Sequence, residues 1–126
     1  MLLGLVSGCS GITTVAYDEK APEASVRMFL VDLQNGRTSE AYGLLLPSRQ
    51  QEVSRERFAH DVAFLGTGAG RITGLRVLGS SLLRPRPLTV QVRVTIQHEQ
   101  TGTRTTGVEA VEVDGRWRVD LGDPAS

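Results

Sequence analysis

Side chains that could exchange protons with a substrate are few in this chain and lie far apart. General acid–base catalysis needs an imidazole or a carboxylate aimed at the reacting group. His60 and Asp61 are consecutive in an expected helix and cannot share one face, so the pattern favours a solvated pair over a catalytic dyad. His98 ends an expected strand beside Glu99 and is predicted to lie at the surface.

Patterns for metal or cofactor binding are missing from the sequence. The two histidines form no His-x-His or Glu-x-x-His pair, and one cysteine cannot make a thiolate cluster. Lys plus Arg and Asp plus Glu are equal at 14 each, so no net charge attracts nucleic acid. The sequence therefore predicts no cofactor, no metal, no nucleic-acid partner and no catalytic residue.

The single cysteine, Cys9, has the most specific chemistry in the chain. It directly follows Val6-Ser7-Gly8, which is one aliphatic residue and two small ones. This string resembles the lipobox of bacterial lipoproteins, in which the cysteine thiol is diacylated and the preceding segment is removed. The resemblance implies a small bacterial lipoprotein that is exported and anchored to the outer face of the cell membrane through a lipid on Cys9.

The segment before Cys9 is shorter than a complete secretory signal. Such signals carry a cationic start and roughly 7 to 15 apolar residues, whereas Met1 to Val6 is short and carries no charge. We therefore expect residues 1–8 to be a truncated lipoprotein signal peptide. Residues 9–21 are small and polar, as suits a lipid-anchored tether. One domain is expected at 22–122, followed by a C-terminal tail at 123–126.

Three helices are predicted in the first half of this domain. The first carries apolar residues at i, i+3, i+4 and i+7 and should end at Asn35-Gly36. Its apolar stripe consists of Val26, Phe29, Leu30 and Leu33. The second is short and ends before Pro47. The third segment closes on Gly66; Ser48 with Gln51 has capping-box spacing at its start, and Ser54 can cap again before Phe58.

In the second half of the chain, the spacing of apolar residues changes from the helical period of about 3.6 residues to the strand period of two. Leu88 to Gln97 alternates strictly between apolar and polar residues, so one face of this strand is buried and the other is wet. Further strands are expected at Ile72 to Leu78, about Arg104 to Val113, and Arg116 to Leu121. Asp114-Gly115 predicts a tight hairpin between the last two strands.

The environment of Glu112 depends on the register of that hairpin. A two-residue turn pairs Glu112 with Trp117 and places the carboxylate on the core side. A bulge near Ala110 and Val111 would instead turn Glu112 outward. The sequence allows both registers.

Helices followed by an antiparallel sheet indicate an α+β fold, with about three N-terminal helices packed on a curved antiparallel sheet of about four strands. The sequence also resembles the cone-shaped, cystatin-like superfamily of nuclear transport factor 2. The resemblance rests on the opening helix, an Ala41-Tyr42 helix ending in Leu-Pro, a helix with Phe58, and the closing Asp114-Gly115-Arg116-Trp117 hairpin. It implies a cone-shaped cavity, with Tyr42, Glu112 and Trp117 as candidates for its rim. Tyr42 and Trp117 are expected to be core aromatics whose polar tips find partners at that rim.

The lining of that cavity decides between catalysis and binding, because the superfamily includes both enzymes and binding modules. The inward face of Leu88 to Ile96 is apolar. We therefore expect a membrane-anchored, non-catalytic binding or interaction module whose partner is an unknown protein or a small apolar ligand. Two alternatives stay open: a small isomerase- or cyclase-type enzyme acting on an apolar ligand, and a homodimer through the sheet that forms a structural part of an envelope assembly.

Overall fold

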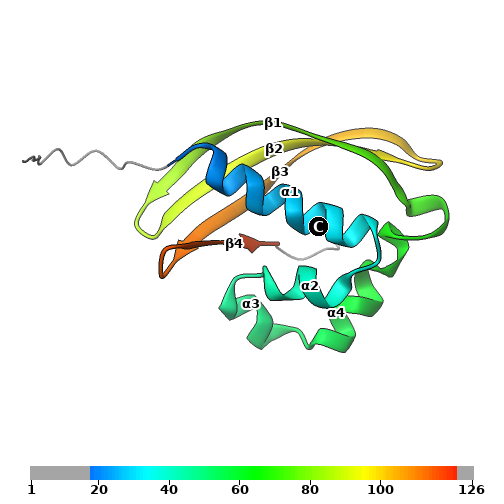
Figure 1. Ribbon diagram of the computed structural model, residues 1–126, viewed down its shortest axis with the longest axis horizontal. Coiled ribbons are helices and arrows are strands. Elements are labelled where there is room, and N and C mark those ends of the chain that lie inside the picture. The colour runs from blue at the N-terminus through cyan, green and yellow to red at the C-terminus, as the bar shows by residue number, and fades with distance from the viewer. Residues whose placement is uncertain (1–17, 122–126) are drawn as a thin grey trace, which may run out of the picture.

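The computed structural model describes residues 18–121 of the chain. The expected signal peptide, the lipidation candidate Cys9, most of the tether and the tail at 123–126 therefore lie outside the described residues. Within the described part, four α-helices lead through two 3-10 turns into four strands (Figure 1). None of the described helices combines the length and the apolar character needed to cross a membrane.

Helix α1 (Lys20–Gln34) carries the predicted apolar stripe. The four stripe residues are buried on one side of this 15-residue helix: Val26, Phe29, Leu30 and Leu33. Because side chains three and four positions apart share one helix face, this stripe can cover a continuous strip of sheet. The prediction of the helix and its buried face is confirmed.

The end of α1 is fixed by a Schellman motif. Gly36 adopts a φ of 75°, and the amides of Gly36 and Arg37 donate to the carbonyls of Leu33 and Asp32. The Arg37 guanidinium also donates to the Asp32 carboxylate, with Nε 3.0 Å from Oδ1. Arg37 therefore binds the last turn of the helix twice, through its backbone and through its side chain.

Three shorter α-helices follow: α2 (Thr38–Gly43), α3 (Pro47–Glu52) and α4 (Arg55–Val62). The sequence predicts one helix fewer, because Pro47 is taken there as the end of the second helix and Ser48 and Ser54 as two cap signals of one third segment. In the structure Pro47 begins α3, a position at which a missing N–H breaks no helical hydrogen bond. Ser54 caps α4 as predicted, since its side chain accepts from the Arg57 amide at 3.1 Å. The 3-10 turns η2 (Ala63–Leu65) and η3 (Gly68–Gly70) then lead to the sheet.

The four strands form one antiparallel sheet in the order β1-β2-β3-β4. They are β1 (Ile72–Pro85), β2 (Leu88–His98), β3 (Gly102–Val113) and β4 (Arg116–Asp120). At 14 residues, β1 is longer than the predicted strand that ended at Leu78. Its register against β2 shifts at three places, near residues 73, 78 and 83. Bulges of this kind bend and twist a strand, and they also interrupt the alternation by which its length could be recognised.

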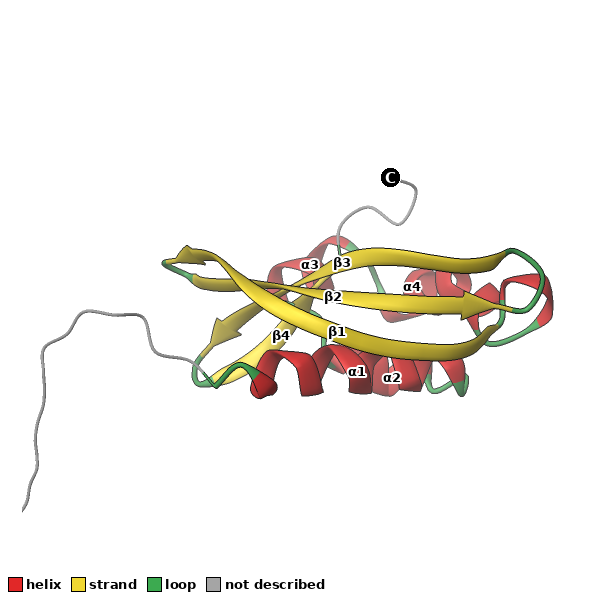
Figure 2. Ribbon diagram, turned by 90° about the horizontal axis from the view of Figure 1, so that it is seen from above, coloured by secondary structure: helices red, strands yellow, loops and turns green. Residues whose placement is uncertain are grey.

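The helices cover the concave face of the sheet, and α1 runs across it (Figures 1 and 2). Three inward positions of β2 are fully buried, as the alternation predicts: Val90, Val92 and Val94. Leu88 and Ile96 at the strand ends are only half-buried. Thr89, predicted on the solvent face, is instead fully buried, and its hydroxyl donates to the Pro87 carbonyl. Phe58 of α4 joins this core, with its ring centroid 6.2 Å from that of Phe29. Burying one large aliphatic side chain contributes about 1.5 to 3 kcal/mol, so this layer is the main source of stability.

The outer edge of β4 is covered by the segment between α2 and α3. The Leu46 amide donates to the Val119 carbonyl, and the Val119 amide donates to the Leu44 carbonyl, both at 2.8 Å. Leu45 and Val119 thus form a parallel bridge. Because β4 is short, these hydrogen bonds occupy backbone groups that an edge strand would otherwise expose.

An ion pair joins α3 to the end of β4. Arg49 Nε lies 2.7 Å from Asp120 Oδ1, and Arg49 also contacts Glu52 at 2.8 Å. The hydrogen bond to Asp120, followed by that to Glu52, raises the pKa of Arg49 above its usual value. The Asp120 side chain is 17% exposed and that of Glu52 is 62% exposed. Solvent therefore screens the contact between Arg49 and Asp120 less than the contact between Arg49 and Glu52.

The Asp114-Gly115 hairpin forms with a two-residue turn. Both turn residues have positive φ, 52° and 80°, as the tight hairpin turn requires. Glu112 pairs with Trp117, so the first of the two registers left open by the sequence is adopted. The Glu112 side chain is nevertheless exposed. The pairing places it on the inward face close to the open turn, where the buried core has ended.

Replacing Gly36 and Gly43 by alanine should change stability in opposite directions. Gly36→Ala forces a Cβ onto a φ of 75° and should lower the free energy of unfolding by about 1 kcal/mol. Gly43 lies in α2 with open space around it, so Gly43→Ala should raise the free energy of unfolding by roughly 0.5 kcal/mol. Urea unfolding of both variants measures this; a destabilisation of equal size in the two would contradict the Schellman end of α1.

Asp120→Asn should lower the free energy of unfolding by about 1 kcal/mol, because it removes the charge that the Arg49 guanidinium contacts. Glu52→Gln, at the exposed contact of the same arginine, serves as the matched control and should have little effect. Unfolding in low and high salt measures both. The Asp120→Asn effect should shrink as salt increases, and an effect that is independent of salt would show that packing rather than charge is responsible.

Candidate functional site

A cavity of about 320 Å³ lies between the helices and one end of the sheet. Most of its lining is apolar and comes from every layer around it. The apolar lining residues are Phe29, Leu30, Leu33, Val62, Phe64, Leu65, Ile72, Ile96, Val108 and Leu121. This volume is at the lower end of the range of sites that bind small molecules, which are largely apolar with a few placed polar groups.

Four polar side chains also line the cavity: Asp61, His98, Arg104 and Thr106. The register of β2 and β3 brings three of them together, because Thr106 pairs with Val94, Arg104 with Ile96, and Gly102 with His98. Residues two apart in a strand share a face, so Thr106, Arg104 and His98 all lie on the concave face. Arg104 and His98 therefore lie beyond the end of the buried valine row, and Thr106 lies opposite its last member, Val94.

His98 differs from its prediction as a surface residue. It is half-buried, and its Nε2 atom is buried with no hydrogen-bond partner among the described residues. An unsatisfied buried polar atom costs about 1 to 3 kcal/mol, so this nitrogen is suited to forming a hydrogen bond with a ligand in the cavity. The signal was present in the sequence: His98 continues the even-numbered apolar row that contains Val94 and Ile96.

The two charged residues of the lining differ in how they are neutralised. The Asp61 carboxylate accepts from Arg57 Nε at 3.1 and 3.2 Å. Arg104 is exposed and forms no ion pair with any acidic side chain in the part of the chain that the structure describes. The lining therefore contains one carboxylate, Asp61, that is already paired with an arginine, and one arginine, Arg104, that forms no ion pair among the described residues.

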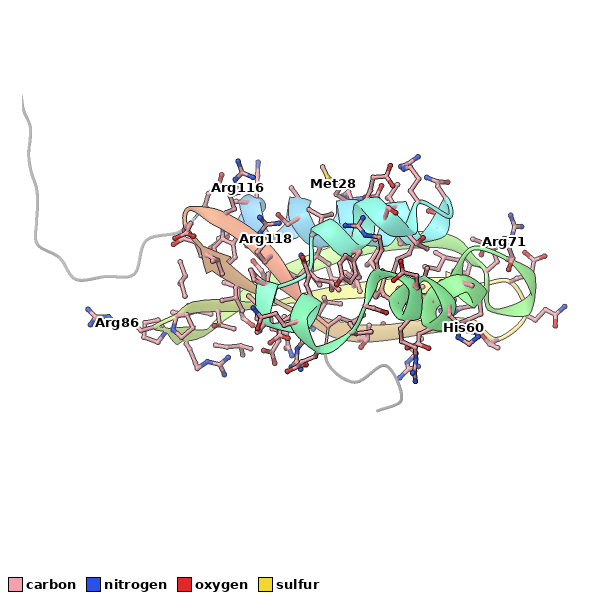
Figure 3. All side chains as sticks on the ribbon, turned by 90° about the horizontal axis from the view of Figure 1, so that it is seen from below. Met28, His60, Arg71, Arg86, Arg116 and Arg118 are labelled. Atoms are coloured by element: carbon pink, nitrogen blue, oxygen red, sulfur yellow. The ribbon has the colours of Figure 1, made fainter. Side chains whose placement is uncertain are left out.

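His60 lies outside this cavity. Its side chain is 86% exposed, and its Nδ1 lies 3.5 Å from Asp61 Oδ1. Figure 3 shows it at the surface near one end of the molecule. The arrangement is that of a solvated residue beside Asp61, and only the Asp61 carboxylate reaches the cavity lining.

Tyr42, expected at the rim, lies away from the cavity and joins three helices. The hydroxyl is 2.8 Å from the carbonyls of Gln50 and of Val53 and donates its proton between them. The Tyr42 ring centroid is 5.6 Å from that of Phe58, and the Arg55 guanidinium stacks 5.1 Å from the same ring. These contacts account for a buried tyrosine without a ligand.

The other two rim candidates, Glu112 and Trp117, also do not line the cavity. They face each other across the β3–β4 hairpin. Trp117 is half-buried and packs against the core, whereas Glu112 is exposed. The cavity lies at the opposite end of β3, where Arg104 and Thr106 belong to its lining.

A second hollow, of about 460 Å³, lies near the C-terminal end of α1. It is lined by small, amide and aliphatic residues from α1, α2, α4 and the following turns, and no titratable side chain belongs to its lining. Among the described residues no group of three His, Cys, Asp or Glu comes together to hold a metal ion. The cavity with His98 and Arg104 is therefore the better candidate site.

Comparison with known proteins gives a match at the level of the fold. No family model and no curated protein matches the sequence. A solved structure described as a candidate NTF2-like transpeptidase, from Campylobacter jejuni, superposes with a TM-score of 0.63 at 18% sequence identity. The match covers 79% of this chain and 97% of that one. At this identity the likeness establishes the architecture and transfers no activity: the chain has the nuclear transport factor 2-like fold.

Proposed function

We propose that this chain is an exported, lipid-anchored and non-catalytic binding domain that takes a small, largely apolar ligand into the cavity. The observation that carries the proposal is the cavity itself, about 320 Å³ in volume, with an apolar floor and a few polar groups at one side. An apolar ligand that enters it removes both its own surface and the lining from water, at about 25 cal/mol per Å² of apolar area.

The chemistry of the lining favours binding over catalysis. Asp61 is the one carboxylate of the lining, and it is occupied by Arg57 at 3.1 Å. An acid–base reaction in this cavity would therefore depend on the His98 imidazole alone. Enzymes of this kind need a base together with preorganised donors for the charge that develops, and the remaining lining offers Arg104 and Thr106.

The ends of the molecule are compatible with an anchor at Cys9. Helix α1 starts at the same end as Arg86 of the β1–β2 hairpin, whereas His60 and Arg71, near the cavity, lie at the other end (Figures 1 and 3). Even when fully extended, the residues between Cys9 and Asp18 span at most about 32 Å. A lipid on Cys9 would hold the α1 end close to the membrane and leave the cavity end directed away from it.

Filling the cavity should abolish ligand binding without unfolding the protein. Thr106→Phe places a ring in the lining, and we expect it to remove the rise in thermal unfolding midpoint that saturating 1-octanol gives to the wild type. Thr105→Phe is the matched control, because the neighbouring residue points to the opposite face and pairs with Thr95. Its response to 1-octanol should equal that of the wild type.

The anchoring part of the proposal has a separate test. In bacteria that express the protein from its own gene with the upstream region, alkyne-palmitate should label the wild type and the Ser10→Ala control, and both should sediment with membranes. Cys9→Ser should lose the label and move to the soluble fraction, because the thiol that accepts the lipid is gone. Equal fractionation of Cys9→Ser and wild type would reject the anchor and leave the cavity proposal intact.

A further inference from the structure

We propose that the ligand of this cavity is an apolar monocarboxylate, whose carboxylate is bound by the Arg104 guanidinium and by His98 Nε2. The inference rests on the proposed function and specifies its ligand class. It follows from two polar groups that have no partner within residues 18–121: the Arg104 cation, which has no acidic neighbour there, and a buried His98 nitrogen, which has no hydrogen bond there.

The sheet register places these two groups beside each other. His98 of β2 pairs with Gly102 of β3, and Arg104 lies two residues further along β3 on the same face. Diagonal neighbours of this kind are about 7 to 8 Å apart at their Cα atoms, within reach of long side chains. One carboxylate can therefore contact both side chains, with one oxygen toward each.

The residue of β3 that pairs with His98 is a glycine, Gly102, which has no side chain. Gly102 directly faces His98 across the strand pair and has a φ of 89°. No atom lies within 4 Å of the position that a Cβ would take. The imidazole therefore has no side chain opposite it on β3. Nε2 itself is buried, so contact with a ligand oxygen requires the imidazole to turn toward the cavity.

The charge balance of the lining selects an anion. Arg57 neutralises Asp61, and Arg71 is paired with Glu99 at 2.8 Å near the same end of the sheet. Arg104 is the charged group of the lining that forms no ion pair among the described residues. Arginine binds a carboxylate through paired N–H donors in a strong, charge-assisted contact. An amine head group would meet Arg104 with like charge.

The rest of the ligand is specified by the floor of the cavity. Phe29, Leu30 and Leu33 of α1 and Val108 of β3 all belong to its lining. This lining offers no polar partner beyond Thr106 and the three groups already discussed. A hydrocarbon chain or ring fits such a surface, whereas a second polar group on the ligand would be buried without a hydrogen bond.

The test compares head groups on one hydrocarbon chain by calorimetric titration of the full chain at pH 8 with octanoate, 1-octanol and octylamine. We expect octanoate to bind most tightly. Arg104→Gln should weaken octanoate binding by about tenfold to a hundredfold, as for the loss of a hydrogen bond to a charged group, and should leave 1-octanol binding unchanged. Arg93→Gln, on the outer face of β2, is the matched control and should behave as wild type.

His98 is tested by a pair of substitutions. His98→Gln keeps an N–H group near the position of Nε2 and should retain most of the preference for octanoate over 1-octanol. His98→Leu preserves bulk but removes the donor, and should reduce that preference. Thermal unfolding of each variant verifies that it is folded before titration, so a loss of binding can be assigned to the site.

The outcomes separate the head-group proposal from the proposed function. Equal affinities for octanoate and 1-octanol, both abolished by Thr106→Phe, would overturn the carboxylate assignment while supporting an apolar cavity site. Tighter binding of octylamine would overturn it in favour of a cationic ligand at Asp61. Binding of none of the three compounds to the folded wild type would overturn the cavity proposal as well.

Discussion

The packing of α1 on the valine row of β2 is the contact on which the rest of the structure depends. Val26, Phe29, Leu30 and Leu33 cover inward positions of the sheet that are fully buried. The Schellman end of α1 then turns the chain so that α2, α3 and α4 return beneath the same face. Without that burial, neither the short helices nor the five-residue strand β4 would bury enough apolar surface to be stable alone.

The candidate site exists because the helix is shorter than the sheet that it covers. A helix of 15 residues spans about 22 Å, and a strand of 11 residues spans about 37 Å. Part of the concave face therefore extends beyond the helix layer at each end. At the β1–β2 hairpin Leu82 is left 44% exposed, whereas at the other end α4 and η2 lie over the strands and form one wall of the cavity.

Much of the fold could be predicted because the decisive signals are local. The stripe of α1, the alternation in β2 and the Asp114-Gly115 turn each need only neighbouring residues to be recognised. The extra helix α3 and the full length of β1 could not be predicted as readily. Pro47 is compatible with both a helix end and a helix start, and the bulges of β1 interrupt its period. The hairpin register was left open and was decided by pairing with β4.

By itself, the sequence determined the α+β class, the buried faces and the lipobox-like string that ends at Cys9, because composition and period are properties of short segments. The site was decided by tertiary structure. Tyr42, a rim candidate, donates its hydroxyl proton to the backbone carbonyls of Gln50 and Val53. His98, expected at the surface, lines the cavity with Arg104. The physical reason is that a side chain's environment depends on which strand end a helix covers and which partner satisfies its polar atoms, and both are set by residues distant in sequence.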